Sequence, residues 1–384
     1  MVLSGLDQNR WSLGLERTNR ALDTLGHPEK AYPHVLVAGT NGKGSTCVFL
    51  ERILLSAGFS TGTTLSPHVS RFTERFRVDG VEVDAGELGK LRAELEPELA
   101  DIGLTYFEWC VVLAVVLFAR RGVDLGIFEV GLGGRYDASN ALDPQVSLIT
   151  EISSDHTDYL GKTIAEIAGE KARIARAGRP LLTAATGAAL AVIREYALLS
   201  GAVLHVVDRP CALPVGPRGA HQGLNASLAL EAARMLGGCP DGGRIEHALW
   251  TAFLPGRVEN LDGRVIMDVA HNASSVLVLV EYLRSHGFDG VGVVGILADK
   301  DYPAMISNLL QVCSRLFIAP VASPRSWGPL EMNQVRDMGA VTLCADVTRA
   351  FHEALQTGRP IAVTGSFHTV SEVRESLICR GWPS

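Results

Sequence analysis

The sequence predicts an α/β protein of two domains, each built on a parallel sheet with helices on both faces. Short apolar runs rich in β-branched residues recur along the chain, and segments with helical spacing lie between them. Near-continuous apolar character is typical of strands that are buried on both faces. The length of 384 residues exceeds one ordinary hydrophobic core. This alternation indicates parallel strands joined by right-handed helical crossovers.

The apolar runs place the elements in order, and a Pro-Gly pair inside 251–260 predicts a boundary between 1–253 and 254–384. The run at 109–119 is 11 residues long, whereas about 20 are needed to cross a bilayer, so it predicts a buried helix. Strands are expected at 35–39, 125–130, 146–152, 265–270, 291–297, 315–320 and 361–366, and helices at 45–57, 108–120, 163–177, 225–236 and 274–286.

Composition excludes several classes of protein. The net charge of −7 argues against a general nucleic-acid binder, because no basic excess exists to neutralise a phosphate backbone. The seven cysteines form no C-x-x-C pair, which favours a reducing compartment over a disulfide scaffold or a zinc site. The first residues lack the layout of a signal peptide. We therefore expect a cytoplasmic protein that binds neither nucleic acid nor membrane.

The stretch VLVAGTNGKGST at 35–46 predicts a phosphate-binding loop between a strand and a helix. Two residues separate Gly39 from Gly42-Lys43, where the usual pattern has four. Glycines let backbone N–H groups converge on an anion at the helix N-terminus. Lys43 supplies charge for phosphates, and Ser45 a hydroxyl for Mg²⁺. A glycine-rich turn without a ligand is the alternative, and the Lys-Gly-Ser-Thr sequence argues against it.

Glu129 ends an apolar strand and precedes the glycine-rich stretch GLGGRYD. A carboxylate in such a strand is costly unless something pairs with it, and ligands of open α/β sheets bind at this end of the strands. Magnesium is one partner for this carboxylate. A structural salt bridge to Arg135 is the other.

Lys171 lies on the apolar stripe of a predicted helix together with Ile164, Ile167, Ala168 and Ile174. Burial lowers the pKa of a lysine and makes its neutral amine available for chemistry. Reaction with CO₂ would convert this amine into a carbamate, which is a metal ligand. Spacing alone favours a snorkelling or salt-bridged lysine instead.

Two polar clusters follow other predicted strands. Asp155-His156 comes directly after one strand, and Asp268 with His271 follows another, close to Arg257 at the domain boundary. Asp, His and Arg side chains near a boundary could grip a nucleotide or close a cleft. A lone loop histidine is more often structural, so this cluster gains weight only from the other motifs.

Nine motifs occur in the order found in the folylpolyglutamate synthase/dihydrofolate synthase family, relatives of the Mur ligases, which this chain resembles over residues 10–375. The resemblance implies an ATP-binding P-loop domain over 1–253 and a smaller Rossmann-like ligase domain over 254–384. The motifs are AGTNGKGST, SPHVSRFTERFRVDG, FEVGLGGRYDASN, DHTDYLGKTIAEIAGEKARI, HQGLNA, LPGRVE, DVAHN, LADKD and TGSFHTV.

The resemblance implies roles for individual residues, including two Mg²⁺ ions. Catalytic roles fall on Lys43, His156, Lys171 and His271, and metal binding falls on Ser45, Glu129, His156 and carbamylated Lys171. ATP binding is implied for Gly39, Thr40, Asn41, Gly42, Lys43, Gly44, Ser45, Asn225, Arg257, Asp268 and His271. Folate or dihydropteroate binding is implied for Ser66, Pro67, His68, Thr105, Phe107, Asp137 and Ala138.

The implied reaction phosphorylates a folate-type carboxylate with ATP, and the amine of L-glutamate then attacks the acyl phosphate. Dihydropteroate and reduced folates are the implied acceptors, and a monomer is expected. A P-loop kinase or regulatory ATPase is the alternative function. The chain departs from the family pattern at Tyr136, Ser139 and Val269, and its 200–220 segment is short, which puts the outer sheet of the domain in doubt.

Overall fold

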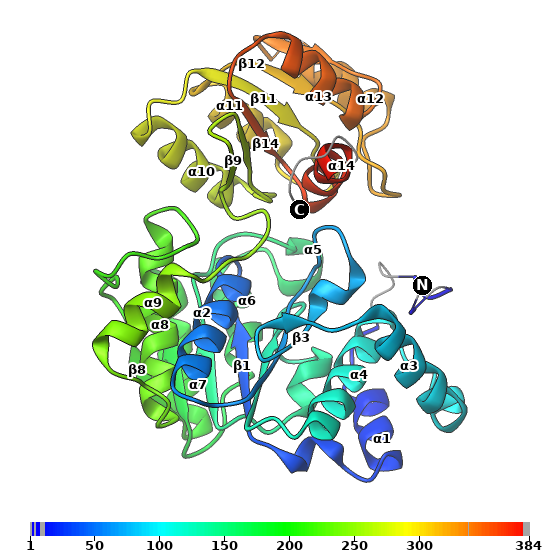
Figure 1. Cartoon of the computed structure of the whole chain (residues 1–384), viewed down its shortest axis with the longest axis vertical. Helices are drawn as coiled ribbons and strands as arrows, with labels where there is room; N and C mark the ends of the chain where they lie inside the picture. Colours follow the sequence, from blue (N-terminus) through cyan, green and yellow to red (C-terminus); the bar gives the residue numbers. More distant parts are fainter. Residues whose placement is uncertain (1, 4, 8–11, 337, 379–384) are drawn as a thin grey trace. The chain divides into compact units, whose positions relative to one another are not determined.

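The computed structural model describes residues 2–3, 5–7, 12–336 and 338–378. The chain forms two compact units, coloured blue to green and yellow to red in Figure 1. The first unit comprises the chain up to Gly216 together with His221–Phe253, and the second comprises Pro217–Ala220 and the chain from Leu254 onward. Each unit contains its own sheet.

The sheet of the first unit has eight strands in the order β4-β3-β2-β5-β1-β6-β7-β8. Its six strands from β2 to β8 pair in parallel, whereas β3 and β4 add an antiparallel edge. The strands are β1 (His34–Ala38), β2 (Thr61–Thr64), β3 (Phe76–Val78), β4 (Val81–Glu82), β5 (Leu125–Glu129), β6 (Val146–Ile149), β7 (Pro180–Thr183) and β8 (Val203–Val206).

Helices cover both faces of this sheet. Buried side chains of α1, α3, α4, α6 and α7 share one apolar cluster, while α2 packs against α8 and α9. The helices are α1 (Glu16–Thr24), α2 (Lys43–Ser56), α3 (Ala85–Leu99), α4 (Tyr106–Arg121), α5 (Thr157–Leu160), α6 (Ile164–Ala172), α7 (Gly187–Ser200), α8 (His221–Met235) and α9 (Gly242–Trp250), with 3-10 turns at Pro28–Ala31, Phe72–Arg75, Ala100–Ile102 and Ala138–Ala141.

Helix α4 illustrates how local sequence defines an element. Thr105 caps its N-terminus in a capping box with Glu108, which satisfies two backbone N–H groups at the helix start. The apolar run that follows is buried, and the helix ends at Gly122 with φ of 63°, a conformation that glycine adopts at low cost. The prediction of a buried helix over 109–119 is confirmed.

The second unit has a six-stranded sheet in the order β13-β12-β11-β14-β10-β9. Only β9 is antiparallel to its neighbour among the described pairs. The elements are β9 (Glu259–Leu261), β10 (Val265–Met267), α10 (Ala273–Ser285), β11 (Gly290–Val294), α11 (Tyr302–Leu309), β12 (Cys313–Ile318), α12 (Pro329–Val335), β13 (Val341–Leu343), α13 (Val347–Gln356), β14 (Ile361–Thr364) and α14 (Phe367–Ile378).

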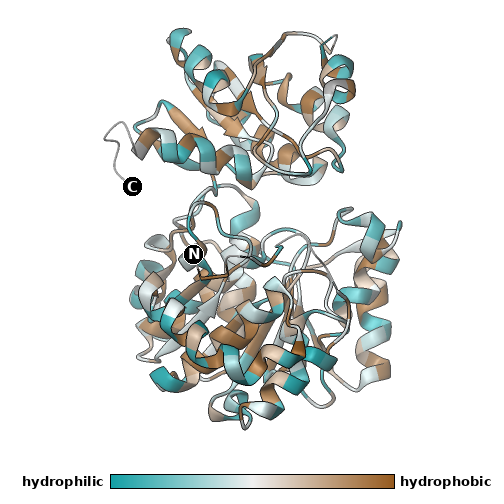
Figure 2. Cartoon of the chain, turned by 90° about the vertical axis from the view of Figure 1, so that its right-hand side faces the viewer, coloured by the Kyte–Doolittle hydropathy of each residue, from teal (hydrophilic) through white to brown (hydrophobic). Residues whose placement is uncertain are grey.

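The predicted fold class is confirmed, and all seven predicted strands and five predicted helices are present with shifted ends. The brown, apolar strands inside each unit in Figure 2 are the runs from which they were predicted. The short 200–220 segment still supplies an outer strand, because β8 pairs with β7 at the edge of the sheet.

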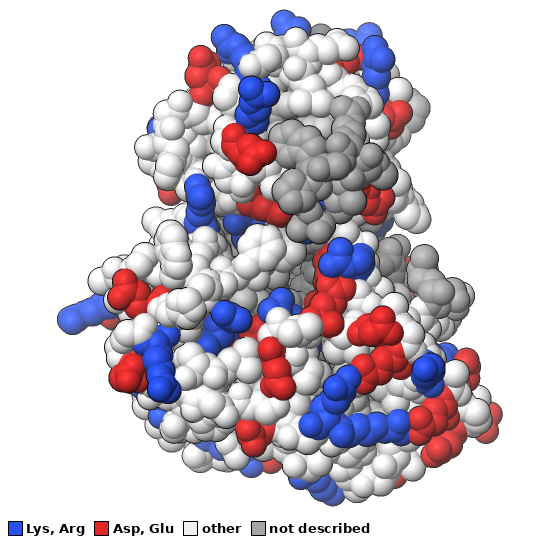
Figure 3. Space-filling view, viewed as in Figure 1, with Lys and Arg blue, Asp and Glu red and all other residues white. Residues whose placement is uncertain are grey.

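The surface and the helices bear on the excluded classes. Acidic and basic side chains alternate over the face shown in Figure 3, and no broad basic surface interrupts that pattern there. Among the described residues, the helices are too short or too polar for any of them to span a lipid bilayer.

Candidate active site

The loop between β1 and α2 turns sharply at two glycines. Gly39 has φ of 144° and Gly42 has φ of 89°, in the region that side chains other than hydrogen rarely adopt. A Cβ atom on Gly39 would overlap the hydroxyl of Thr150, and one on Gly42 would overlap the amide of Asn225. Both positions therefore require glycine, and the loop passes closely between β6 and α8.

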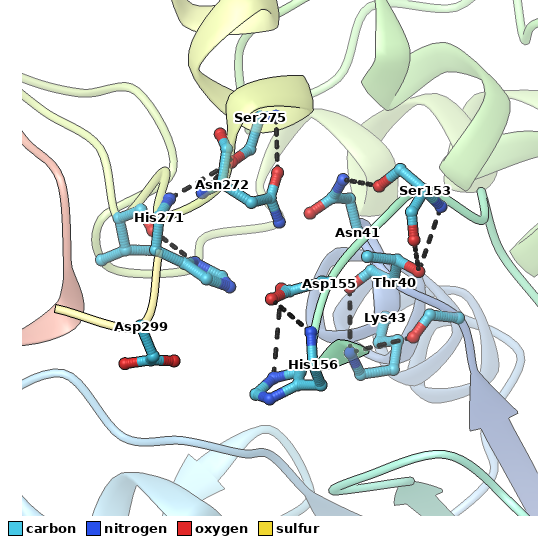
Figure 4. Close-up of polar contacts among 12 residues, drawn as sticks. Thr40, Asn41, Lys43, Ser153, Asp155, His156, His271, Asn272, Ser275 and Asp299 are labelled. Atoms are coloured by element: carbon cyan, nitrogen blue, oxygen red, sulfur yellow. Dashed lines mark hydrogen bonds and ion pairs between the residues drawn. The ribbon is translucent and has the colours of Figure 1, made fainter. Parts of the chain in front are cut away.

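Side chains fasten this loop to the segment after β6. Thr40 N–H donates to the Glu151 carbonyl at 2.8 Å, and the Asn41 amide donates to Ser153 Oγ at 3.1 Å (Figure 4). Thr150 Oγ1 donates to the Asn41 carbonyl at 2.6 Å. These bonds fix the backbone of the predicted phosphate loop. Sequence reasoning missed Thr150 and Ser153, although polar residues that close a buried strand are a usable signal.

Two lysines converge on the carbonyl of Gly39. Lys43 Nζ donates to it at 3.2 Å and to the Thr40 carbonyl at 3.1 Å, and Lys171 Nζ donates to it at 2.7 Å. Burial lowers the pKa of Lys171 to about 7, and the charge of Lys43 lowers it further. The expectation of a snorkelling or salt-bridged Lys171 is wrong. The residue is 5% exposed, and none of the described ion pairs includes it.

Ser45 and Glu129 suit a hard metal ion. Ser45 is 1% exposed, and its Oγ has no hydrogen-bond partner among the described residues. Glu129 is buried at the end of β5, beside β1, and accepts a hydrogen bond from Ser66 N–H at 2.8 Å. The alternative partner Arg135 lies 3.8 Å from Glu170 instead. A buried hydroxyl and a buried carboxylate are ligands that Mg²⁺ accepts.

The metal site is incomplete without a nucleotide. Among the described residues, no three His, Cys, Asp or Glu side chains converge on one point. Magnesium in nucleotide sites takes one or two carboxylates and completes its shell with phosphate oxygens and water. The donor set of Ser45 and Glu129 fits that pattern.

His156 follows β6 in a left-handed backbone conformation with φ of 51°. Its N–H donates to Asp155 Oδ1 at 2.8 Å, and its Nε2 lies 3.9 Å from Asp155 Oδ2 (Figure 4). The charge of Asp155 raises the pKa of Lys171, against the larger lowering by burial. His156, Asp155 and Lys171 therefore belong to one electrostatic cluster beside the phosphate loop. A non-glycine residue at positive φ often marks a functional site.

A pocket in the first unit brings together residues predicted for the acid substrate and for metal. Ser66, Phe107 and Glu129 line it, and the Phe107 ring packs on the backbone of Gly131. Pro67 and His68 follow Ser66 in the same loop, where His68 Nδ1 accepts a hydrogen bond from Arg75 at 2.8 Å. The complete lining is Thr64, Leu65, Ser66, Arg75, Phe76, Phe107, Cys110, Val111 and Glu129.

The remaining predicted acid-binding residues shape two neighbouring turns. Thr105 caps α4 directly before Phe107. Asp137 is buried and accepts hydrogen bonds from the N–H groups of Gly131 and Leu132, both at 2.9 Å, and from Ser139. Burial raises the pKa of this carboxyl. Ser139 keeps the hydroxyl of the threonine usual in the family, so this departure preserves the turn around Ala138.

Asn225 lies on α8 against the phosphate loop. It is 6% exposed, its amide donates to Gln222 Oε1 at 3.1 Å, and its Oδ1 faces the backbone of Gly42. The structure therefore places this predicted nucleotide contact beside the loop, although 180 residues separate the two in sequence.

Three predicted nucleotide contacts gather in the second unit. His271 Nδ1 bonds the Val269 carbonyl at 2.9 Å (Figure 4), and its ring centroid lies 5.6 Å from that of Phe367. The Arg257 guanidinium lies 5.5 Å from the centroid of the same Phe367 ring. Asp268 accepts from Val258 N–H at 2.9 Å and Ala270 N–H at 2.8 Å.

Burial raises the pKa of Asp268, and the charge of Arg257 opposes that rise. Val269, which stands where many members of the family have glycine, is fully buried. The side chains of Arg257, Asp268 and His271 therefore form one cluster at the end of β10.

Comparison with known proteins identifies the family. Residues 37–184 match the Mur ligase middle domain. The chain is 35% identical to "Dihydrofolate synthase/folylpolyglutamate synthase" of Escherichia coli K12, over 98% of this chain and 94% of that protein. It is 32% identical to the protein of the same name from Bacillus subtilis 168, over 95% of each chain.

Solved structures resemble the whole chain. "E.coli FolC in complex with DHPP and ADP" superposes with a TM-score of 0.89 at 34% identity, covering 99% of this chain and 96% of that one. The bifunctional synthase of Yersinia pestis, complexed with AMPPNP and Mn, gives a TM-score of 0.88 at 33% identity over 98% and 96% of the two chains. The chain therefore belongs to the dihydrofolate synthase/folylpolyglutamate synthase family of ATP-dependent ligases.

Proposed function

We propose that this chain joins L-glutamate to dihydropteroate and to the γ-carboxylate of reduced folates, with ATP as the energy source. The proposal is supported by the names of the full-length relatives and by the DHPP and ADP of a similar solved structure. Another similar structure carries Mn, AMPPNP and L-glutamate. We further propose that the chain acts as a cytoplasmic monomer with two Mg²⁺ ions.

The observation that carries this proposal is the buried Lys171 amine at the phosphate loop. Its pKa of about 7 leaves a large neutral fraction at pH 7. The neutral nitrogen bonds to the carbon of CO₂ and loses a proton, which yields a carbamate. This product turns a cation beside the loop into an anion that can bind metal.

Each residue then has one task. Loop N–H groups from Gly39 to Ser45 and the Lys43 ammonium hold the phosphates of ATP. Ser45 and Glu129 hold the first Mg²⁺, and His156 with carbamylated Lys171 holds the second. The two ions would offset the negative charge that develops on the transferring phosphoryl oxygens. Asn225, Arg257, Asp268 and His271 contact the nucleotide, and Ser66, Pro67, His68, Thr105, Phe107, Asp137 and Ala138 contact the acid.

The reaction balances in two steps. A carboxylate oxygen of the acid attacks the γ-phosphorus of ATP, and the bond to ADP breaks, which gives an acyl phosphate. The glutamate amine attacks the acyl carbon, a tetrahedral intermediate forms, and inorganic phosphate leaves as the amide forms. Burial of the loop and of Glu129 keeps water from a hydrolysable intermediate.

The first test is product analysis. Mass spectrometry of mixtures with ATP, glutamate and either dihydropteroate or tetrahydrofolate should detect one new glutamyl amide for each acceptor. Phosphate release that does not depend on glutamate, without an amide product, would reject the ligase.

A second candidate function, a P-loop kinase or regulatory ATPase, is separated by Lys171. The phosphate loop alone is compatible with such an enzyme, which has no need of a carbamate. Lys171→Ala should abolish amide formation by the ligase, and added CO₂ should not restore it. A kinase would retain most of its turnover.

A further inference from the structure

The first-unit pocket contains a buried cation to which the proposed reaction assigns no role. Arg75 ends the 3-10 turn Phe72–Arg75, directly before β3, and is 7% exposed. It lines the pocket together with Ser66, Phe107 and Glu129. The guanidinium is therefore enclosed next to the proposed metal ligand and the proposed acid-binding residues.

No carboxylate of the described residues pairs with Arg75. Its Nε donates to His68 Nδ1 at 2.8 Å, and its guanidinium carbon lies 5.5 Å from the centroid of the Tyr106 ring. The neighbouring Arg71 and Arg77 instead pair with Glu82 and Glu51, both at 2.8 Å. A buried, unpaired charge is costly, and a guanidinium has five N–H donors. Arg75 is therefore poised for an anion.

The walls of the pocket limit the form of that anion. Phe76 and Phe107 line it, and Phe72 packs at 5.2 Å from Phe76 and 6.0 Å from Tyr106, measured between ring centroids. Aromatic walls favour an aromatic or otherwise flat ligand body. A planar carboxylate matches the guanidinium fork with two parallel hydrogen bonds.

We propose that Arg75, held by His68, binds the carboxylate of the acceptor acid and presents it beside Glu129. Arg75 is thus a specificity-determining residue that selects an aromatic acid over its neutral analogue. This inference rests on the proposed function, because it assigns a group of the same acid substrate.

Equilibrium binding without ATP tests the proposal. Wild-type protein and Arg75→Gln are titrated with dihydropteroate and with dihydropteroate carboxamide, in which the acid is replaced by a neutral amide. Loss of a charged hydrogen-bond pair predicts about ten- to a hundredfold weaker binding of the acid to the variant. Binding of the carboxamide should stay the same. The ratio of the two affinities reports recognition of charge, which a purely structural role would not change.

A second arm identifies the carboxylate. Tetrahydrofolate, whose aromatic ring carries an amide, offers only glutamyl carboxylates. Weakening of dihydropteroate by Arg75→Gln assigns the aryl carboxylate, and weakening of tetrahydrofolate alone assigns a glutamyl carboxylate. Unchanged binding of both acids, or equal weakening of acid and carboxamide, overturns the proposal.

Two further variants guard the result. Arg75→Lys keeps the charge but not the fork, and should weaken the acid less than Arg75→Gln while leaving the carboxamide unchanged. It replaces Arg75→Gln if that variant does not fold. Arg71→Gln removes an exposed charge of the same loop and should bind as wild type. A wild type that binds neither acid and forms no amide would instead contradict the proposed function.

Discussion

At the residue scale, Lys171 couples folding to pH. Its pKa is about 7 in the folded chain and 10.5 for an ordinary lysine. Between these values the unfolded chain carries one proton that the folded chain lacks. Raising the pH through this window therefore favours the folded state.

Lys171→Met should remove this pH dependence. In CO₂-free buffer, the unfolding free energy of wild type relative to Lys171→Met should rise by about 1.4 kcal/mol per pH unit between pH 8 and 10. Denaturant unfolding of both proteins across that range measures the difference. Groups shared by both proteins cancel, and a difference that stays constant with pH would place the amine in solvent.

The burial of Lys171 could be predicted from the apolar stripe around it, but its partner could not. The Gly39 carbonyl lies 132 residues earlier in the sequence, and only the neighbouring positions of β1 and β6 bring the two elements together. Arg75 escaped prediction for a similar reason. A charged residue between Phe72 and Phe76 resembles an ordinary edge-strand residue until the pocket is formed.

At the scale of elements, the start of α4 has a structural and a proposed binding task. Thr105 closes the capping box and stands next to the pocket residue Phe107. Helix α6 starts with a similar box, in which Thr163 accepts from Glu166 N–H at 3.2 Å. The pair permits a separation of capping from binding.

Thr105→Ala and Thr163→Ala should each destabilise the first unit by about 1 kcal/mol, because each removes one N-cap hydroxyl. Only Thr105→Ala should also weaken dihydropteroate binding, and Thr105→Ser should restore both properties. Thermal unfolding and ligand titration measure the two effects. Equal loss of binding in both alanine variants would mean that stability, not contact, sets the affinity.

Strands with continuous apolar runs could be predicted, whereas those without them could not. β2 has the sequence TGTT, and β8 is partly exposed at the sheet edge. Such strands owe their conformation to pairing with a neighbour, which single-strand periodicity does not contain. Strand order is hidden for the same reason, because β5 inserts between β1 and β2 despite its later place in the chain.

At the scale of the whole molecule, nucleotide binding should stabilise the folded chain through its phosphate loop. With Mg²⁺ and AMPPNP at about a hundred times its Kd, the unfolding free energy of the binding unit should rise by about 2.7 kcal/mol. Calorimetry with and without the ligand measures the shift. Two transitions are possible because the chain has two compact units.

Chelation of Mg²⁺ by EDTA, or Lys43→Met, should remove most of this stabilisation. A full shift in EDTA would contradict a metal held by Ser45 and Glu129. Lys30→Met, on the 3-10 turn before β1, changes the same charge outside the loop and should leave the shift unchanged.

The antiparallel edge of the first sheet has an evolutionary consequence. The segment between β2 and β3 carries Ser66, His68 and Arg75, whereas the phosphate loop follows the central strand β1. Exchange of this peripheral hairpin between homologous genes would leave the central strands paired as before. A lineage could thereby acquire a taste for new acids while its fuel-handling machinery stays ancestral.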